Sequence, residues 1–102
     1  MKLKIGGAII AVEEAEMDEY GRFDHEKEKI FLRSGLQGPQ RHRTLLHEII
    51  HVVWSEYDLP TDPVEETCVR RLESGLSAFI MDNPDVAKAL VSEISKLRRE
   101  RT

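Results

Sequence analysis

The motif H-E-x-x-H, which runs from His47 to His51 inside a long apolar stretch, constrains this chain more than any other feature. On an α-helix, residues four positions apart lie on one face about 6 Å apart, so both imidazole rings can bind one metal ion. Glu48 projects about 100° around the helix from His47. Its carboxylate would therefore lie beside the metal, where the general base of a metallopeptidase accepts the proton of an activated water.

The residues around this motif favour a metal site over an accidental match. Leucine, isoleucine and valine fill the positions beside and between the histidines, and Glu48 is the only charge between Thr44 and Ser55. Two histidines and a glutamate are costly to bury in such a helix unless they are paired or bind a metal. The alternative is a buried helix with two hydrogen-bonded core histidines and a solvent-facing glutamate.

Composition predicts one small domain that spans the whole chain. Its 102 residues, 40% of them hydrophobic, can form one modest core. A net charge of −4 disfavours binding to nucleic acid or to an anionic membrane, because both require a basic surface. Cys68 is the only cysteine, so we expect a plain buried thiol and a reducing compartment. The longest early apolar stretch, Ala8 to Val12, is too short for a signal or a membrane span, so we expect a cytoplasmic protein.

The first third of the sequence predicts a small antiparallel β-sheet within residues 2–33. Apolar or alternating residues occur in three segments, Lys2 to Val12, Tyr20 to Asp24 and Lys29 to Arg33. Gly6-Gly7 indicates a bend or bulge in the first of them. The segment from Lys29 to Arg33 is expected to offer a free edge, on which a substrate could add as a further strand.

The remaining sequence predicts three helices, at about 39–57, 63–82 and 84–99. The first must end before Pro60, because proline disfavours helical geometry in the residue that precedes it. Asp62, Pro63 and Glu65 form a capping box for the second helix. The third helix is predicted to start in the same way, with Asn83 as the N-cap residue and Pro84 as the proline that follows it. The expected fold class is therefore α+β, with an N-terminal sheet followed by a motif helix and two further helices.

A catalytic zinc normally takes three protein ligands and leaves one position for water, so the motif needs a third ligand. The longer pattern H-E-x-x-H-x-x-G-x-x-H is excluded, because Trp54 stands at its glycine and Tyr57 at its last histidine. We expect Trp54 to be a core aromatic residue near the site. A glutamate on the following helix is the other common solution, and three residues qualify: Glu65, Glu66 and Glu73.

Position favours Glu66 among these three. It lies on the inward stripe near the start of the second helix, and it can reach the histidines if the first helix stops near Glu56. Glu65 already has a predicted capping role, and Glu73 lies two turns further along the same face. Both remain alternatives.

The segments T-L-L-H-E-I-I-H-V-V-W and E-E-T-C-V-R-R-L-E-S-G-L, joined by a proline-containing loop, resemble small phage- and prophage-encoded zinc peptidase-like proteins. Those proteins are related to the ImmA/IrrE metallopeptidases. The resemblance covers about residues 44–83 and is most specific at H-E-x-x-H, whereas Val69 and Leu72 replace the alanine and phenylalanine of larger members. It implies a minimal gluzincin-type zincin in which Glu48 is the general base. The implied zinc ligands are His47, His51 and Glu66.

The expected activity is zinc-dependent hydrolysis of a protein or peptide substrate, in the host cytoplasm if the protein is phage-encoded. Zinc would activate water and polarise the scissile carbonyl, and Glu48 would carry the proton to the leaving amine. An additional donor is expected for the tetrahedral oxyanion. Four side chains qualify for that role: Tyr20, His25, His42 and Tyr57.

Two other functions are compatible with the same residues. A binding or regulatory protein would keep the zinc and the fold without turnover, since so short a chain has little room for a substrate cleft. A purely structural helical domain would bind no metal, and a chelator would leave its stability unchanged. The sequence pattern leaves the oligomeric state open.

Overall fold

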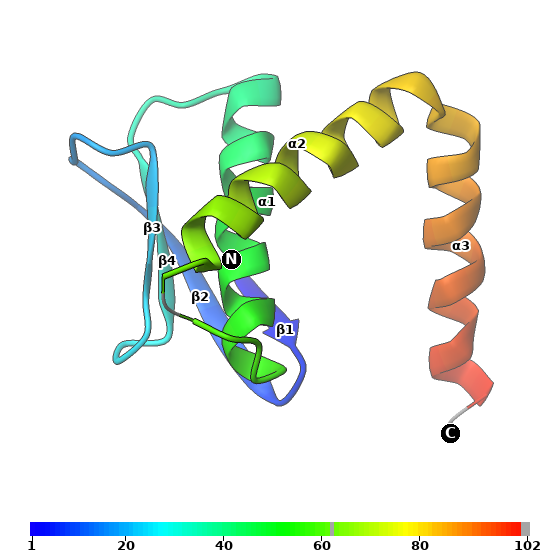
Figure 1. Ribbon diagram of the computed structural model, residues 1–102, viewed down its shortest axis with the longest axis horizontal. Coiled ribbons are helices and arrows are strands. Elements are labelled where there is room, and N and C mark those ends of the chain that lie inside the picture. The colour runs from blue at the N-terminus through cyan, green and yellow to red at the C-terminus, as the bar shows by residue number, and fades with distance from the viewer. Residues whose placement is uncertain (62, 101–102) are drawn as a thin grey trace.

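The computed structural model describes residues 1–61 and 63–100, which form four β-strands followed by three α-helices (Figure 1). The strands are β1 (Lys2–Ile5), β2 (Ala8–Ala15), β3 (Gly21–Asp24) and β4 (Lys29–Arg33). The helices are α1 (Gly38–Glu56), α2 (Glu65–Asp82) and α3 (Pro84–Glu100). The predicted α+β class, with a sheet before three helices, is confirmed.

The sheet is mixed, with the strand order β1-β2-β4-β3. β1 pairs antiparallel with β2, and β3 pairs antiparallel with β4, but β2 and β4 are parallel. After β2 the chain crosses to the far edge of the sheet and forms β3. It then turns back through a hairpin, so that β4 lies between β2 and β3. A strand inserted this way must run parallel to β2. The prediction of an antiparallel sheet was therefore wrong at this central pairing.

The same insertion decides which strand has a free edge. β4 is hydrogen-bonded on both sides, so the prediction of a free edge at Lys29 to Arg33 was wrong. β3 lies at the edge instead, and it packs against α1. At the other edge, the bend predicted at Gly6 is the turn between β1 and β2, where a φ of +58° favours glycine.

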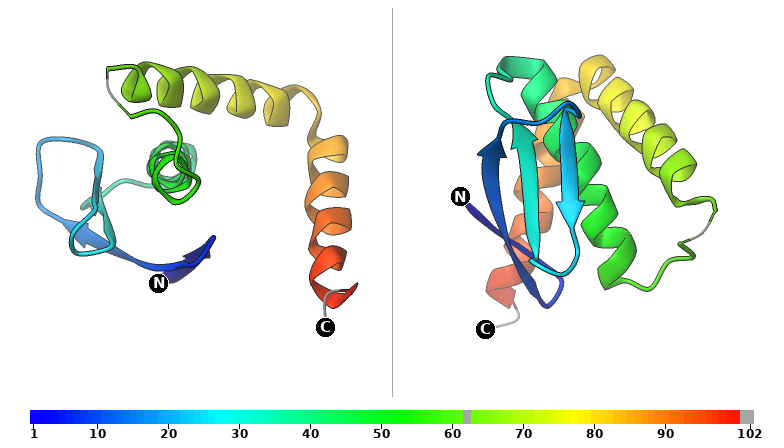
Figure 2. Two further views of the ribbon diagram at one scale, coloured as in Figure 1. Left: turned by 60° about the horizontal axis from the view of Figure 1, so that its bottom comes forward. Right: turned by 90° about the vertical axis from the view of Figure 1, so that its left-hand side faces the viewer.

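α1 lies between the sheet and α2, as the end-on view in Figure 2 shows. Alternate residues of β2 and β4 point toward α1, and they form the main core with Val52. A second cluster on the opposite side of α1 joins Ile50 and Trp54 to Val69 of α2, with the partly buried Cys68 against it. The Trp54 indole N–H also donates to the Pro60 carbonyl at 2.6 Å, which fixes the loop before α2. Trp54 is thus the core aromatic residue that was expected.

The boundaries of α1 and α2 matter for the site. α1 ends at Glu56, the end point that allows the chain to turn back toward the histidines. α2 begins at Glu65, two residues later than predicted, because residues 63 and 64 form a turn. Asp62, the predicted N-cap, lies outside the described residues.

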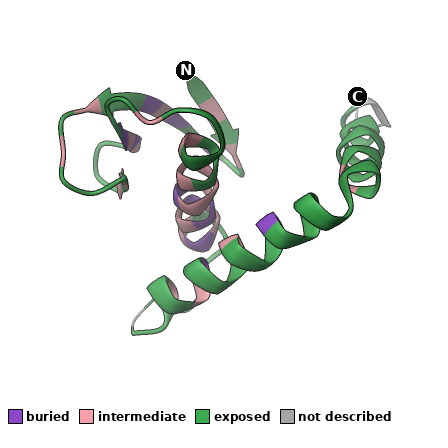
Figure 3. Cartoon of the chain, turned by 90° about the horizontal axis from the view of Figure 1, so that it is seen from above, coloured by how far each residue is buried: buried purple, intermediate pink, exposed green. Residues whose placement is uncertain are grey.

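α3 leaves the rest of the molecule at the end of α2, so that the two helices form an open elbow (Figure 1). Its contacts are made mainly with α2. None of its described side chains, at residues 84–98, is buried (Figure 3). Within the described residues, no helix combines the length and the apolar character that crossing a membrane requires.

Candidate metal centre

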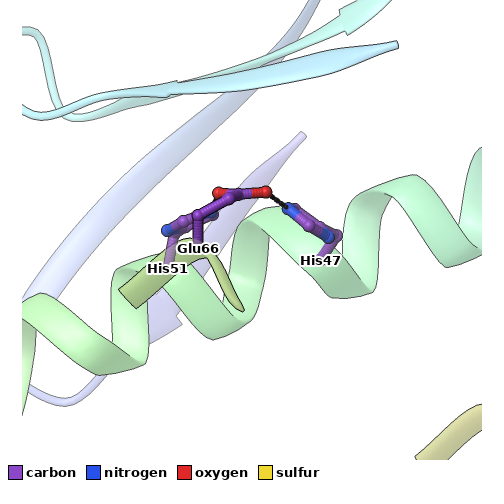
Figure 4. Close-up of side chains that lie close together, drawn as sticks. All are labelled: His47, His51 and Glu66. Carbon is purple, nitrogen blue, oxygen red and sulfur yellow. Dashed lines mark hydrogen bonds and ion pairs between the residues drawn. The ribbon is translucent and has the colours of Figure 1, made fainter. Parts of the chain in front are cut away.

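Three of the residues predicted to bind zinc lie together between α1 and α2. α1 carries His47 and His51 one turn apart on the side that faces α2, with ring centroids separated by 5.1 Å. The first turn of α2 brings the Glu66 carboxylate between the two rings, as Figure 4 shows. Its Oε1 lies 3.0 Å from Nε2 of His47, and its Oε2 lies 2.8 Å from Nε2 of His51. One ligand atom from each residue lies within 4.8 Å of the other two, close enough to share a metal ion.

The hydrogen bonding around His51 fits a cation at this point. Glu65 Oε2 lies 2.5 Å from Nδ1 of the ring, while Glu66 faces Nε2. Carboxylate oxygens only accept hydrogen bonds, so two of them flanking one imidazole require a proton on each nitrogen or a cation in place of one proton. Two imidazole nitrogens and a carboxylate oxygen form the donor set that suits zinc.

The two alternative third ligands contact the other sides of the imidazole rings. Glu65 accepts a hydrogen bond from His51 Nδ1, so its carboxylate is directed to the histidine rather than to the start of α2. Glu73 Oε1 lies 3.9 Å from His47 Nδ1. Histidines that ligate a metal almost always donate their other N–H to a carboxylate, a carbonyl or water. Glu65 meets that requirement for His51, and the Glu73 carboxylate lies on the corresponding side of the His47 ring.

Glu73 is itself held by a cation from α1. Arg43 Nε donates to Glu73 Oε2 at 2.8 Å, and the guanidinium Nη2 contacts the same oxygen. Ser77 Oγ, one turn further along α2, lies 3.4 Å from that oxygen. This pairing fixes the Glu73 carboxylate beside the ring of His47. Arg43 was not singled out from the sequence, because one arginine near a helix start has no distinctive pattern.

Glu48 is buried where β3 crosses α1, with only 6% of its surface exposed. The close approach depends on Gly21, since a Cβ atom there would lie 3.2 Å from Glu48 Oε2 and 2.8 Å from Thr44 Cγ2. Burial is the largest of the effects that together raise the pKa of Glu48 from 4.5 to about 7, and the nearby Glu66 and Glu19 charges act in the same direction. The charge of His51 and a hydrogen bond from the Phe23 backbone lower the pKa. A pKa near neutrality suits a general base.

Two adjoining clefts reach these residues. One of about 690 Å³ runs past His47, Glu48 and Glu66 and is lined further by Tyr20 and Gly21. Another of about 440 Å³ lies along β3 and reaches His51. Both volumes fall in the range of about 300–1,000 Å³ that ligand pockets occupy. Each cleft is therefore large enough to hold a small molecule or a short peptide segment.

The four candidate oxyanion donors divide into two groups. Tyr20 and His25 line the clefts beside Glu48. His42 instead donates from Nδ1 to the Gly38 carbonyl at 2.9 Å, and Tyr57 lies against the turn at Gly6. Neither of the latter two lines the clefts beside Glu48.

Arg70 also lies at the site, although it was not predicted from the sequence. Its Nε lies 3.4 Å from Glu66 Oε1, and its side chain lines both clefts. The spacing of four residues between Glu66 and Arg70 is the signal that could have revealed it, since such pairs meet on a helix.

No protein-family model, no curated protein and no solved structure matches this chain. The function of the protein is therefore inferred from the chemistry and geometry of the site between α1 and α2.

Proposed function

We propose that the protein is a zinc-dependent metallopeptidase in which His47, His51 and Glu66 bind the metal. The observation that carries the proposal is the Glu66 carboxylate facing both Nε2 atoms, with the buried Glu48 on the adjacent position of the same helix. The resemblance of the motif region to phage- and prophage-encoded zinc peptidase-like proteins supports the same class, and we propose such an origin.

The roles of the protein groups follow from their positions. Zinc, when bound, supplies the polarisation of the scissile carbonyl and the activation of water. Glu48 accepts the proton of that water and donates it to the leaving amine. Glu65 holds the proton on Nδ1 of His51, which leaves Nε2 to face the metal. Tyr20 and His25, which line the clefts, are the candidates that would stabilise the oxyanion.

The substrate that fits best is an extended segment of a protein or peptide. β3 is an edge strand, and the Phe23 backbone that hydrogen-bonds to Glu48 belongs to it. An added strand on this edge would run through the clefts beside the metal centre, with its backbone hydrogen-bonded to β3. The role first expected for β4 is thus transferred to β3.

A second candidate function is a zinc-binding interaction or regulatory protein without turnover. The observation that favours it is the exposure of large apolar side chains on α2 and α3, such as Leu72 at 46% and Ile94 at 60%. Exposed apolar surface of this kind marks sites of protein association. In that case zinc would stabilise the fold, and Glu48 would be dispensable.

One experiment separates these functions. Metal content is measured for the purified wild type and the Glu48→Gln variant, and both are incubated with a mixture of unstructured peptides whose cleavage is followed by mass spectrometry. The peptidase predicts about one zinc per chain in both proteins and cleavage by the wild type alone. Zinc in both without cleavage supports the interaction protein, and no zinc after zinc addition contradicts both.

A further inference from the structure

The larger and the smaller cleft share the lining residues that surround the metal centre. Those shared residues are Glu19, Gly21, His47, Glu48, Glu66 and Arg70. A peptide that extends through both clefts would therefore have its scissile bond at this junction. Glu19 and Arg70 are the charged residues of the set that have no role in the proposed hydrolysis, and Arg70 is the cation of the two.

Arg70 approaches the metal centre from α2, one turn after Glu66. Its Nε lies 3.4 Å from Glu66 Oε1, and the same oxygen lies 3.0 Å from Nε2 of His47. A carbonyl group that is polarised between these ligands would therefore lie near the guanidinium. The Nη atoms of Arg70 carry further N–H donors, and 74% of its side chain is exposed, so they are open to a substrate atom.

The ion pair with Glu66 leaves Arg70 able to bind a second anion. Exposed ion pairs between residues four apart on a helix are weak, because water screens both charges. A metal ion bound by Glu66 would also draw charge from the carboxylate that Arg70 contacts. In the metal-loaded protein, the guanidinium would therefore interact less with Glu66 and more with an anionic group of the substrate.

Peptide hydrolysis creates such an anion at the junction of the clefts. When the water oxygen bonds to the scissile carbonyl carbon, the carbonyl π electrons move to the carbonyl oxygen, and Glu48 accepts the water proton. The oxyanion loses its charge when the C=O bond re-forms, the C–N bond breaks and Glu48 donates the proton to the leaving nitrogen. The charge of Glu19, which already opposes ionisation of Glu48, would also oppose the oxyanion. A cation at the junction would offset that repulsion.

Arg70 is better placed for this role than the two donors predicted from the sequence. Tyr20 lines the larger cleft and His25 lines the smaller one, so each lies to one side of the junction. Each also packs against a neighbour. The Arg33 guanidinium lies 5.8 Å from the centre of the Tyr20 ring, and the rings of Phe23 and His25 have centroids 5.0 Å apart. Arg70, in contrast, lines both clefts.

We propose that Arg70 is a catalytic residue that donates a hydrogen bond to the oxyanion of the scissile carbonyl. The proposal rests on the proposed peptidase function and adds a residue to it. Because the charge of the oxyanion is absent from the bound substrate and present in the transition state, Arg70 stabilises the transition state more than the substrate complex. Its removal should therefore lower kcat and leave KM nearly unchanged.

The first test compares zinc content and peptide cleavage for the full-length, zinc-loaded wild type and three variants: Arg70→Ala, Arg70→Lys and Arg71→Ala. Arg71 is also exposed and projects about 100° around α2 from Arg70, which makes it the matched control. The substrate is the peptide that the wild type cleaves fastest in a mixture of unstructured peptides. Arg70→Ala should lower kcat about 100-fold, Arg70→Lys should keep part of it, and Arg71→Ala should equal the wild type. Zinc content per chain should be equal in all four.

The kinetic outcomes distinguish the proposal from its alternatives. A higher KM with unchanged kcat in Arg70→Ala would make Arg70 a substrate-binding residue, and loss of zinc would make it a positioning residue for Glu66; either result overturns the proposal. Cleavage by the wild type with an unchanged kcat in Arg70→Ala overturns the role of Arg70 alone. Absence of cleavage by the wild type contradicts the peptidase function itself.

A second measurement does not require turnover. Inorganic phosphate, which is tetrahedral and anionic like the reacting carbonyl group, is titrated into the zinc-loaded proteins in a calorimeter. Arg70→Ala should raise the dissociation constant of phosphate at least about 10-fold, and Arg71→Ala should leave it unchanged. Equal phosphate affinities in the wild type and Arg70→Ala would overturn the proposal.

Discussion

Glu65 Oε2 lies 2.5 Å from Nδ1 of His51, on the other edge of the ring from the Glu66 carboxylate. Two consecutive residues in the first turn of α2 thus contact the two nitrogens of one imidazole. Glu66 faces the nitrogen that would bind zinc, and Glu65 holds the other. This division gives the two neighbouring carboxylates different expected effects on metal binding.

Substitution of these two glutamates should separate their roles. Glu66→Gln removes a ligand and should abolish zinc binding at micromolar metal. Glu65→Gln loses only the carboxylate that orients His51, and it should weaken zinc affinity about 10- to 100-fold. Competition with a chromogenic chelator measures both, with Glu14→Gln on β2 as an exposed control that should bind as the wild type does. Equal losses in the two variants would contradict the division of roles.

Glu48→Gln should keep the zinc and lose the activity. Glutamine has nearly the shape of glutamate but cannot accept the water proton, so kcat/KM should fall at least about 100-fold. Zinc content and peptide cleavage are measured on the same preparation. If cleavage continues at the wild-type rate in the variant, another residue is the base.

The buried Glu48 should make the metal-free protein less stable as the pH rises. Its pKa is raised from 4.5 to about 7, so the folded state holds the proton where the unfolded chain has released it. The stabilisation is complete below about pH 4.5 and is lost as the pH rises to about 7, a change of about 3 kcal/mol. Urea unfolding of the metal-free wild type and Glu48→Gln should show a difference between the two proteins that changes over this range. A constant difference would contradict the raised pKa.

Gly21→Ala should destabilise the contact between β3 and α1. The added Cβ would lie 2.8 Å from Thr44 Cγ2 and 3.2 Å from Glu48 Oε2, so a cost of about 1–3 kcal/mol is expected. Gly7→Ala is the matched control, because a Cβ at that position meets no atom within 4 Å. Thermal unfolding measures both.

The clash at Gly21 can be relieved from its other side. Thr44→Ser removes the Cγ2 methyl group and keeps the hydroxyl that donates to the Gln40 carbonyl. The double variant Gly21→Ala, Thr44→Ser should therefore regain part of the lost stability. If Thr44→Ser merely adds its own cost, the steric account of Gly21 is wrong.

Chelation should lower the melting temperature of the zinc-loaded protein. Ligand present at about 100 times its dissociation constant stabilises the folded state by about 2.7 kcal/mol. For a domain of this size that corresponds to about 10–20 °C. His47→Ala should show no response to a chelator, which makes it the control. An unchanged melting temperature in the wild type would favour the purely structural helical domain.

The sequence predicted local relationships well. The fixed rise of a helix brings His47 and His51 to one face. The inward stripe that favoured Glu66 is confirmed at Val69, three residues later, but not at Leu72, which is 46% exposed. α1 also ends before Pro60, as predicted from the effect of a proline on the residue that precedes it. Each of these features depends on residues close together in the chain.

Relationships between distant segments were harder to predict. Alternating residues identify β3 and β4 as strands but do not decide which one lies at the edge, because pairing depends on the connections. The capping role predicted for Glu65 rested only on its neighbours in the sequence. In the structure its carboxylate contacts His51 instead. Gly21 has no sequence neighbour that reveals Thr44 and Glu48, so its requirement for glycine follows only from the packing of β3 on α1.

The position of Glu66 at the beginning of α2 has a consequence for folding. A cation bound by both His51 and Glu66 would cross-link two residues that are 15 positions apart in the chain. By analogy with a disulfide across such a loop, this cross-link would remove about 3 kcal/mol of chain entropy from the unfolded state. The metal would then also hold the elbow of α2 and α3 against α1 and the sheet. Without the metal, α2 and α3 would detach from α1 before the sheet unfolds.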